Sequence, residues 1–551
     1  MVAAAAFLTS LRRSVVNVAM GLSPLKSRAF LKREFSDFSS IILLLIALIP
    51  ASAEAVPLIS RCVSTATEPG LCPSSAALTH SCTAGSVDVI AGSVLNCSDI
   101  DVSVSGQVNV ADGVVTLLAR NLTIGQNYKI QAASSQTLLT GIDIELTGSL
   151  TLSGTLRAQN AGGGSFVAVD AQGAISVSGT SPAIDTQGVQ QAANGGDIYL
   201  SSGGTVTVGS DLYLNGQDGG TDSNINSGGS LALQAAQNVS INAEVRAFGR
   251  MFSGGDIMIA TPGMISVNFD AVSGGPKGKL TVEGHGISGW GGTVELYAGD
   301  EILISGPISA AGGIGNTGGD APGGQITLNA GCGGIVLEDL IDVTGGSFDG
   351  GDLDAEAAGP ITVSSTIDAS SRRAGGYGGT VGLVSGRLLT LIESANVNVN
   401  GHDGSSADDH GDGGLALLAG CTLDVRGTAS THATVTALGA RGGAMSLEAS
   451  QSTVPTSQPS LRIAASAVLD TTGSASSGAI SLQAAVKRVG YCSNNTTVAC
   501  TVNSQCVLGG CNSGTCTLPP PNPDTSGVAT QFHPAPTIRQ NLALSPCSAC
   551  S

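Results

Sequence analysis

Residues 197–216 read DIYLSSGGTVTVGSDLYLNG, and this stretch decides the fold. It holds three short segments in which apolar and small polar residues alternate, with Gly or Ser between the segments. Alternation with a period of two predicts β-strands. Each segment offers one apolar face that it cannot bury alone, so copies of the unit must stack strand over strand around a common core.

The same unit recurs from Gly164 to Gly478, and each copy opens with Gly and an alternating strand, as in GTVELYA at Gly292. The interval between openings varies because the loop after the third strand varies, from NAEVRAFGRMFSG to NGHDGSSADDHGDGG. We expect Gly at the corners because they need tight bends and positive φ, and because rungs approach within about 4.8 Å. The sequence therefore predicts an all-β, single-stranded right-handed parallel β-helix of about 14–15 rungs, with Gly-rich loops along one edge and disulfide-stabilised ends.

This pattern resembles bacterial right-handed β-helix (β-solenoid) proteins, specifically exported adhesins of the filamentous-haemagglutinin type. The resemblance covers residues 85–486 and rests on the alternating, Gly-punctuated units. It implies the fold and an adhesive or structural role outside the cell. The chain departs from that family in lacking an NPNG-type secretion signature near its amino terminus.

The amino-terminal region carries the pattern of an export signal. Residues 41–49 read IILLLIALI, follow basic residues from Lys26 to Arg33, and precede the small residues Ala51-Ser52-Ala53. This run is typical of a secretory signal peptide and falls short of the roughly 20 residues that span a membrane. We therefore predict a signal over residues 1–55, a secreted or cell-surface protein, and no transmembrane segment in the mature chain. The expected parts are then a Cys-containing cap and first rung (56–100), the β-helix (101–486) and a Cys-rich module and tail (487–551).

Composition excludes several classes of protein. Hydrophobic residues make up 42% of the chain and charged residues 12%, which is unlike a disordered protein. The net charge of −18 and the absence of a basic stripe argue against a nucleic-acid partner. Divalent cations and neutral glycans are easier partners for such a chain.

The 13 cysteines all follow the predicted signal, and export makes disulfides their expected state. The spacing of the carboxyl-terminal group leaves zinc as an alternative, although paired CxxC knuckles are missing apart from Cys547 and Cys550. Cys332 and Cys421 occupy the same place in units three rungs apart, about 14 Å, which is beyond disulfide reach, so we expect free thiols there. The disulfide candidates flank the two ends of the repeat: Cys62, Cys72, Cys82, Cys97, Cys492, Cys500, Cys506, Cys511, Cys516, Cys547 and Cys550.

The longest polar loop, within residues 400–414, carries the densest set of possible metal ligands. Flexible oxygen-rich loops suit calcium, but the spacing matches neither an EF-hand nor the nonapeptide calcium repeat. We expect no cofactor unless this loop binds calcium, and the alternative is a solvated acidic loop. Asp354 alternates into an expected interior position, so it should have a partner or its rung should be irregular. The candidate metal ligands are His402, Asp403, Asp408, Asp409, His410 and Asp412.

Many parallel β-helices act on polysaccharides, and their catalytic residues follow characteristic sequence patterns. A pectin-hydrolase-like site would resemble NTD, DD, GHG and RIK in that order, but Gly284-His285-Gly286 precedes Asp408-Asp409 and no NTD precedes either. A lyase-like site would want a Lys or Arg base beside calcium-binding acids, and Arg372 and Arg373 only lie on a loop. We therefore expect no catalytic residue and no enzyme activity.

Aromatic placement gives the main clue to function. Four rings lie one or two residues before a Gly-Gly opening, in a chain with 3% aromatic residues: Phe252, Trp290, Phe348 and Tyr377. Rings in a column on the loop edge could stack on sugar faces, or they could plug gaps between the loops and the solenoid. We expect an adhesive or structural role, with a glycan or surface receptor as partner and with self-association open. The alternatives are a carbohydrate-active lyase or hydrolase and a pure structural spacer.

Overall fold

The computed structural model describes residues 80–82, 86–90, 94–97, 101–104 and 107–111, then 113–484 with gaps, then 490–492, 495–500 and 516–517. Within 113–484 the longer gaps are 135–139, 217–225, 269–277, 314–320, 403–410 and 451–460. All regular elements of the described part are β-strands. No helix within those ranges is long and apolar enough to cross a membrane. The predicted signal over 1–55 lies outside the described residues.

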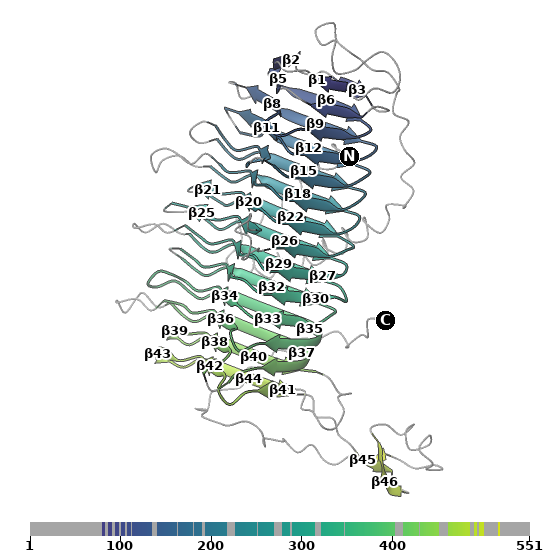
Figure 1. The fold of residues 1–551 in the computed structure, drawn as a ribbon. Helices are drawn as coiled ribbons and strands as arrows, with labels where there is room; N and C mark the ends of the chain where they lie inside the picture. The colour runs from purple at the N-terminus through teal and green to yellow at the C-terminus, as the bar shows by residue number, and fades with distance from the viewer. Residues whose placement is uncertain are drawn as a thin grey trace. The chain divides into compact units, whose positions relative to one another are not determined.

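Three parallel ladders of strands make up the solenoid, and each turn of the chain adds one strand to each ladder (Figure 1). The third ladder is a separate 14-stranded sheet, which confirms the predicted rung number. At the strand spacing of about 4.8 Å, this sheet extends about 60 Å. The first and second ladders join into one sheet because β35 and β37 pair in both. The fold is therefore the expected all-β parallel β-helix.

The first ladder consists mainly of six-residue strands: β3 (Val94–Cys97), β6 (Val114–Ala119), β9 (Gly141–Leu146), β12 (Phe166–Ala171), β15 (Asp197–Ser202), β18 (Ser230–Ala235), β22 (Asp256–Thr261), β26 (Thr293–Ala298), β29 (Gln325–Ala330), β32 (Asp352–Ala357), β35 (Thr380–Leu391), β37 (Leu415–Val425), β40 (Ala444–Ala449) and β44 (Ala479–Ala484). The second ladder has shorter strands, to which the ends of β35 and β37 add: β1 (His80–Cys82), β4 (Val102–Val104), β7 (Leu122–Ile124), β10 (Leu150–Leu152), β13 (Ile175–Val177), β16 (Val206–Val208), β19 (Val239–Ile241), β23 (Ile265–Val267), β27 (Glu301–Ile304), β30 (Gly334–Leu337), β33 (Ile361–Val363) and β41 (Leu461–Ile463).

The third ladder precedes most of the long loops: β2 (Ser86–Ile90), β5 (Gln107–Ala111), β8 (Lys129–Ser134), β11 (Thr155–Asn160), β14 (Ile184–Asp185), β17 (Leu212–Tyr213), β20 (Glu244–Arg246), β24 (Lys279–Thr281), β28 (Ile308–Ser309), β31 (Ile341–Asp342), β34 (Thr366–Asp368), β36 (Asn396–Asn398), β38 (Thr434–Thr436) and β42 (Val468–Asp470). Two small parallel pairs lie within the loops: β21 (Gly249–Arg250) with β25 (Gly284–His285), and β39 (Gly439–Arg441) with β43 (Gly473–Ser476). A separate antiparallel sheet follows the solenoid in sequence: β45 (Gly490–Cys492), β46 (Asn495–Cys500) and β47 (Cys516–Thr517).

The core forms as the alternation predicts, because every second residue of a strand points inward. Ile198, Val206 and Leu212, one from each ladder of the same rung, have no exposed surface. Each inward residue stacks on an inward residue of the next rung, as Ile198 does on Leu231. Each such side chain contributes about 1.5–3 kcal/mol by burial, and the ladder repeats this along its whole length.

The parity predicted for one strand is wrong. On β32 the buried residues are Leu353, Ala355 and Ala357, whereas Asp354 is exposed and points outward with Asp352 and Glu356. In a strand of small apolar and acidic residues, the sequence alone allows either set of alternate residues to point inward. The burial of Leu353 decides which set does. The carboxylate of Asp354 therefore does not enter the core.

A spine of Gly-Gly pairs, from Gly195-Gly196 to Gly442-Gly443, closes nine consecutive rungs where the loop returns to the first ladder. A Cβ on the first glycine, such as Gly323, would meet the carbonyl oxygen of Val343 in the next rung. A Cβ on the second, Gly324, would meet that of Gly292 in the previous rung. These glycines are absent from the positive-φ residues of the described chain, whereas Gly375 is among them. Close backbone approach therefore requires glycine at these two positions, whereas positive φ requires it at other corners, as at Gly164 with a φ of 82°.

Candidate functional site

Most long connections lie between a third-ladder strand and the next Gly-Gly pair, as predicted (Figure 1). The prediction that all of them do so is wrong, because residues 268–278 join β23 to β24 and residues 450–460 join β40 to β41. We call the side that carries the connections before the Gly-Gly pairs the loop edge. Backbone hydrogen bonds show which rung holds each residue that precedes a Gly-Gly pair. The amide of the first glycine of one pair donates to the carbonyl of the residue that precedes the pair of the next rung. Gly254 donates to Trp290, Gly291 to Pro322, Gly323 to Asp349 and Gly350 to Tyr377. These positions therefore occupy consecutive rungs.

The four rings predicted from the sequence are all exposed on this edge. The exposed fractions are 54% for Phe252, 51% for Trp290, 40% for Phe348 and 44% for Tyr377. Phe252 and Trp290 stack with centroids 6.3 Å apart and planes 12° from parallel. Stacked rings have centroids from about 4.5 Å apart, so these two overlap only in part and each keeps an open face. We call the four residues the aromatic edge.

Local hydrogen bonds hold two of these rings in place. The amide of Trp290 donates to the carbonyl of Phe252 at 2.6 Å, and Ser253 forms a parallel bridge with Trp290. The amide of Tyr377 donates to Oδ1 of Asp349 at 3.1 Å. Hydrogen bonds from backbone amides to the neighbouring rung, rather than side-chain packing alone, therefore set the spacing of the rings.

A second cluster, which the sequence analysis missed, lies on the segments that leave the third ladder in the same loops. Phe248 stacks on His285 with centroids 4.5 Å apart. The guanidinium carbon of Arg246 lies 5.2 Å from the ring centroid of Tyr213 and 5.8 Å from that of Phe248, within cation–π range. Glu244 binds Arg246 at 2.5 Å and compensates its charge.

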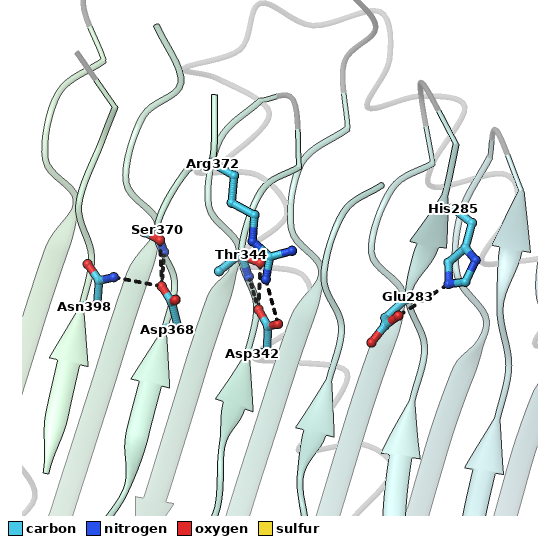
Figure 2. Close-up of polar contacts among 8 residues, drawn as sticks. All are labelled: Glu283, His285, Asp342, Thr344, Asp368, Ser370, Arg372 and Asn398. Atoms are coloured by element: carbon cyan, nitrogen blue, oxygen red, sulfur yellow. Dashed lines mark hydrogen bonds and ion pairs between the residues drawn. The ribbon is translucent and has the colours of Figure 1, made fainter. Parts of the chain in front are cut away.

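Glu283 and His285 form a polar pair on this cluster (Figure 2). His285 Nε2 lies 3.3 Å from Glu283 Oε2. Burial opposes ionisation of Glu283, but the hydrogen bond with His285 and the charge of Lys279 outweigh burial and lower the pKa of this carboxyl. The histidine of the Gly284-His285-Gly286 motif is thus held between a carboxylate and a ring.

Polar residues continue along the next third-ladder rungs in a pattern that links strands (Figure 2). Asp342 Oδ1 accepts hydrogen bonds from the amide and hydroxyl of Thr344 at 2.9 and 2.7 Å, and its Oδ2 pairs with Arg372 at 3.0 Å. Asp368 Oδ1 accepts from the amide and hydroxyl of Ser370 and from Asn398 of the next rung at 3.0 Å. These groups satisfy one another, so Arg372 is engaged in an ion pair rather than presented as a base.

The structure describes two of the six candidate metal ligands. Asp412 pairs with Arg441 at 2.7 Å and also accepts its backbone amide at 3.2 Å. His402 is exposed, and its backbone bonds the rung of Gly375 and Gly376. Asp403, Asp408, Asp409 and His410 lie outside the described residues. Within the described ranges, no three His, Cys, Asp or Glu residues are grouped as a metal site would need.

Cys332 and Cys421 are both disulfide-bonded, so the expectation of free thiols is wrong. The ladder register keeps them three rungs apart, through Ala330, Ala357, Ser385 and Gly420. The expectation of free thiols took into account only a disulfide between these two cysteines. Their three-rung separation excludes that disulfide. At the ends, β45 and β47 place Cys492 opposite Cys516, and disulfide pairing at both ends stays a prediction.

No protein-family model, no curated protein and no solved structure matches the chain. The function has therefore to be argued from the residues of the site.

Proposed function

We propose that the chain is an extracellular β-solenoid that binds glycans along its loop edge, in an adhesive or structural role. The observation that carries the proposal is the exposure of all four rings of the aromatic edge. Aromatic residues are scarce in this chain, and a pure spacer would be expected to bury them against its loops. Covering exposed rings with an apolar surface is favourable, and the flat C–H faces of sugars provide such a surface.

The surroundings of the rings favour a neutral ligand over a polyanion. Asp349 and Asp412 precede Gly-Gly pairs in the same column, and the chain carries a net charge of −18. A sulfated or uronate-rich polymer would approach against this field. Neutral sugars would instead stack on the rings and use their hydroxyls with backbone groups of the loops.

The first test is a screen of the purified protein on a glycan array, with calcium and with a chelator. The test variant is Trp290→Ala/Tyr377→Ala, and the matched control is Tyr199→Ala, whose ring is 42% exposed on the outer face of the first ladder. Each ring contributes about 0.5–1.5 kcal/mol in stacking, so the double variant should bind about 5- to 150-fold more weakly while the control keeps its affinity.

Two results would contradict the proposal. One is the absence of binding to every glycan by folded protein, which would favour the structural spacer. The other is release of cleaved sugar from a bound glycan, which would favour the carbohydrate-active enzyme.

A further inference from the structure

The four rings of the aromatic edge form two pairs with the same placement. In each pair a Phe lies two residues before a Gly-Gly, and the ring of the next rung lies one residue before its Gly-Gly. The first pair is Phe252 with Trp290, and the second is Phe348 with Tyr377. The bonds that set the register also match, since Gly254 donates to Trp290 and Gly350 to Tyr377, both at 2.8 Å.

A translation of three rungs relates the two pairs. Trp290, Pro322, Asp349 and Tyr377 follow one another in consecutive rungs through the glycine hydrogen bonds given above. Three rungs of a parallel ladder span about 14 Å, and Phe252 to Tyr377 spans four rungs, about 19 Å. The rung between the pairs carries Ala321 and Pro322 at the two ring positions.

We infer that the two pairs are equivalent sugar-binding subsites, and that the ligand is a linear neutral glycan long enough to occupy both. This inference rests on the proposed function and adds ligand length and direction to it. The subsites repeat along the stacking direction of the solenoid, so an extended chain running along that direction meets a ring pair twice. A branched or compact glycan would meet only one pair.

Two linked subsites predict a steep dependence of affinity on ligand length. A ligand that covers one pair binds with the weak affinity of two rings. When a ligand covers both pairs, its contact with the second pair becomes intramolecular. Such linkage raises affinity by about 10²–10⁴ when the geometry fits. Ordering of a flexible glycan opposes part of this gain, so we expect at least about a 10-fold step.

The experiment is calorimetric titration with unbranched β-1,4-linked glucan, xylan and mannan oligosaccharides, each as a series of increasing length. We expect weak binding of short members of one series and a step of at least about 10-fold once the ligand spans both pairs. Phe252→Ala/Trp290→Ala and Phe348→Ala/Tyr377→Ala should each abolish the step while keeping the weak binding of short ligands. Tyr199→Ala/Met258→Ala, which removes two exposed side chains of the first ladder, is the control and should keep the step.

The outcomes separate this inference from the proposed function. Binding whose affinity is the same for short and long ligands overturns the two subsites and leaves glycan binding in place. A step that survives loss of either ring pair overturns the inference as well. Failure of every series to bind the folded protein contradicts both. Far-ultraviolet circular dichroism and a thermal melt of each variant establish that the solenoid is intact.

Discussion

The glycine spine makes a sharp prediction for Gly324→Ala. The added Cβ would clash with the carbonyl oxygen of Gly292 and lie 2.7 Å from the carbonyl carbon of Gly291, both backbone atoms. The rungs cannot separate freely, because the same carbonyl of Gly292 accepts a hydrogen bond from Gln325 at 3.0 Å. Overpacking costs about 1–3 kcal/mol and a weakened ladder bond about 1 kcal/mol, so we expect about 3 kcal/mol of destabilisation.

Gly382→Ala is the matched control, because Gly382 lies on β35 of the same solenoid with space for a side chain. Its Cβ would meet only Oδ1 of Asp354 at 3.0 Å, the movable end of a side chain, and then the carbonyl of Leu353 at 3.8 Å. Alanine in a strand interior gains about 0.5–1 kcal/mol over glycine, so this variant should be neutral or slightly stabilised.

Thermal melting and hydrogen exchange measure the difference. An unfolding entropy of about 2.1 cal/mol/K per residue gives roughly 0.8 kcal/mol/K for a solenoid of this size, so 3 kcal/mol lowers Tm by about 4 °C. Local opening at β26, β29 and β32 should speed amide exchange by about 100-fold, since each 1.36 kcal/mol is tenfold. The reasoning is refuted if Gly324→Ala melts with the wild type, or if Gly382→Ala is equally destabilised.

Three further predictions concern electrostatics and rung linkage. Burial, with Asp197 nearby, raises the pKa of Tyr199 to about 12, and burial raises the pKa of Tyr297 to about 12. Stability should therefore fall as pH rises from 10 to 12, and Tyr199→Phe should reduce the phenolate absorbance that appears late in this range. Hydrogen bonds from Arg120 and Asn121 lower the pKa of Asp101 from 3.8 to about 2, so the contribution of Asp101 to stability is present above pH 3.8 and lost as pH falls towards 2. Arg120→Met should flatten this part of the acid denaturation curve. An unchanged curve would argue against the Arg120–Asp101 pair. Asp368→Ala removes the acceptor of three hydrogen bonds and should lower the free energy of urea unfolding by about 1–3 kcal/mol. Asp352→Ala, at an exposed position, should change it by no more than about 0.5 kcal/mol. Equal effects of the two variants would contradict the role assigned to Asp368.

Most of the fold could be predicted because its determinants are local. Period-two alternation in DIYLSS or TVELYA marks the inward residues directly, and Gly-Gly marks the point where nine of the rungs close. The parity of GDLDAEA could not be read in this way, because Asp354 and Leu353 exchange faces with a shift of one residue. Packing of Leu353 in the column of Ile326 decides it.

The site was only partly predictable because register joins residues far apart in sequence. Position before Gly-Gly was enough to find the aromatic edge. Phe248 and His285 are 37 positions apart, and only the pairing of β21 with β25 brings their rings together. In the sequence EVRAF, the alternation predicts that Arg246 and Phe248 point outward. It does not predict which residues of the neighbouring rung they contact.

The most direct test of the central claim uses Trp290, which is the only tryptophan of the chain. Its intrinsic fluorescence reports on the aromatic edge without any label. The account predicts that a soluble quencher reaches the half-exposed ring freely in the unbound protein. It also predicts that a bound glycan shifts the emission to shorter wavelength and reduces quenching, in a saturable manner that follows the binding curve. Glycan binding that leaves the emission and the quenching of Trp290 unchanged would contradict the claim that this edge is the binding surface.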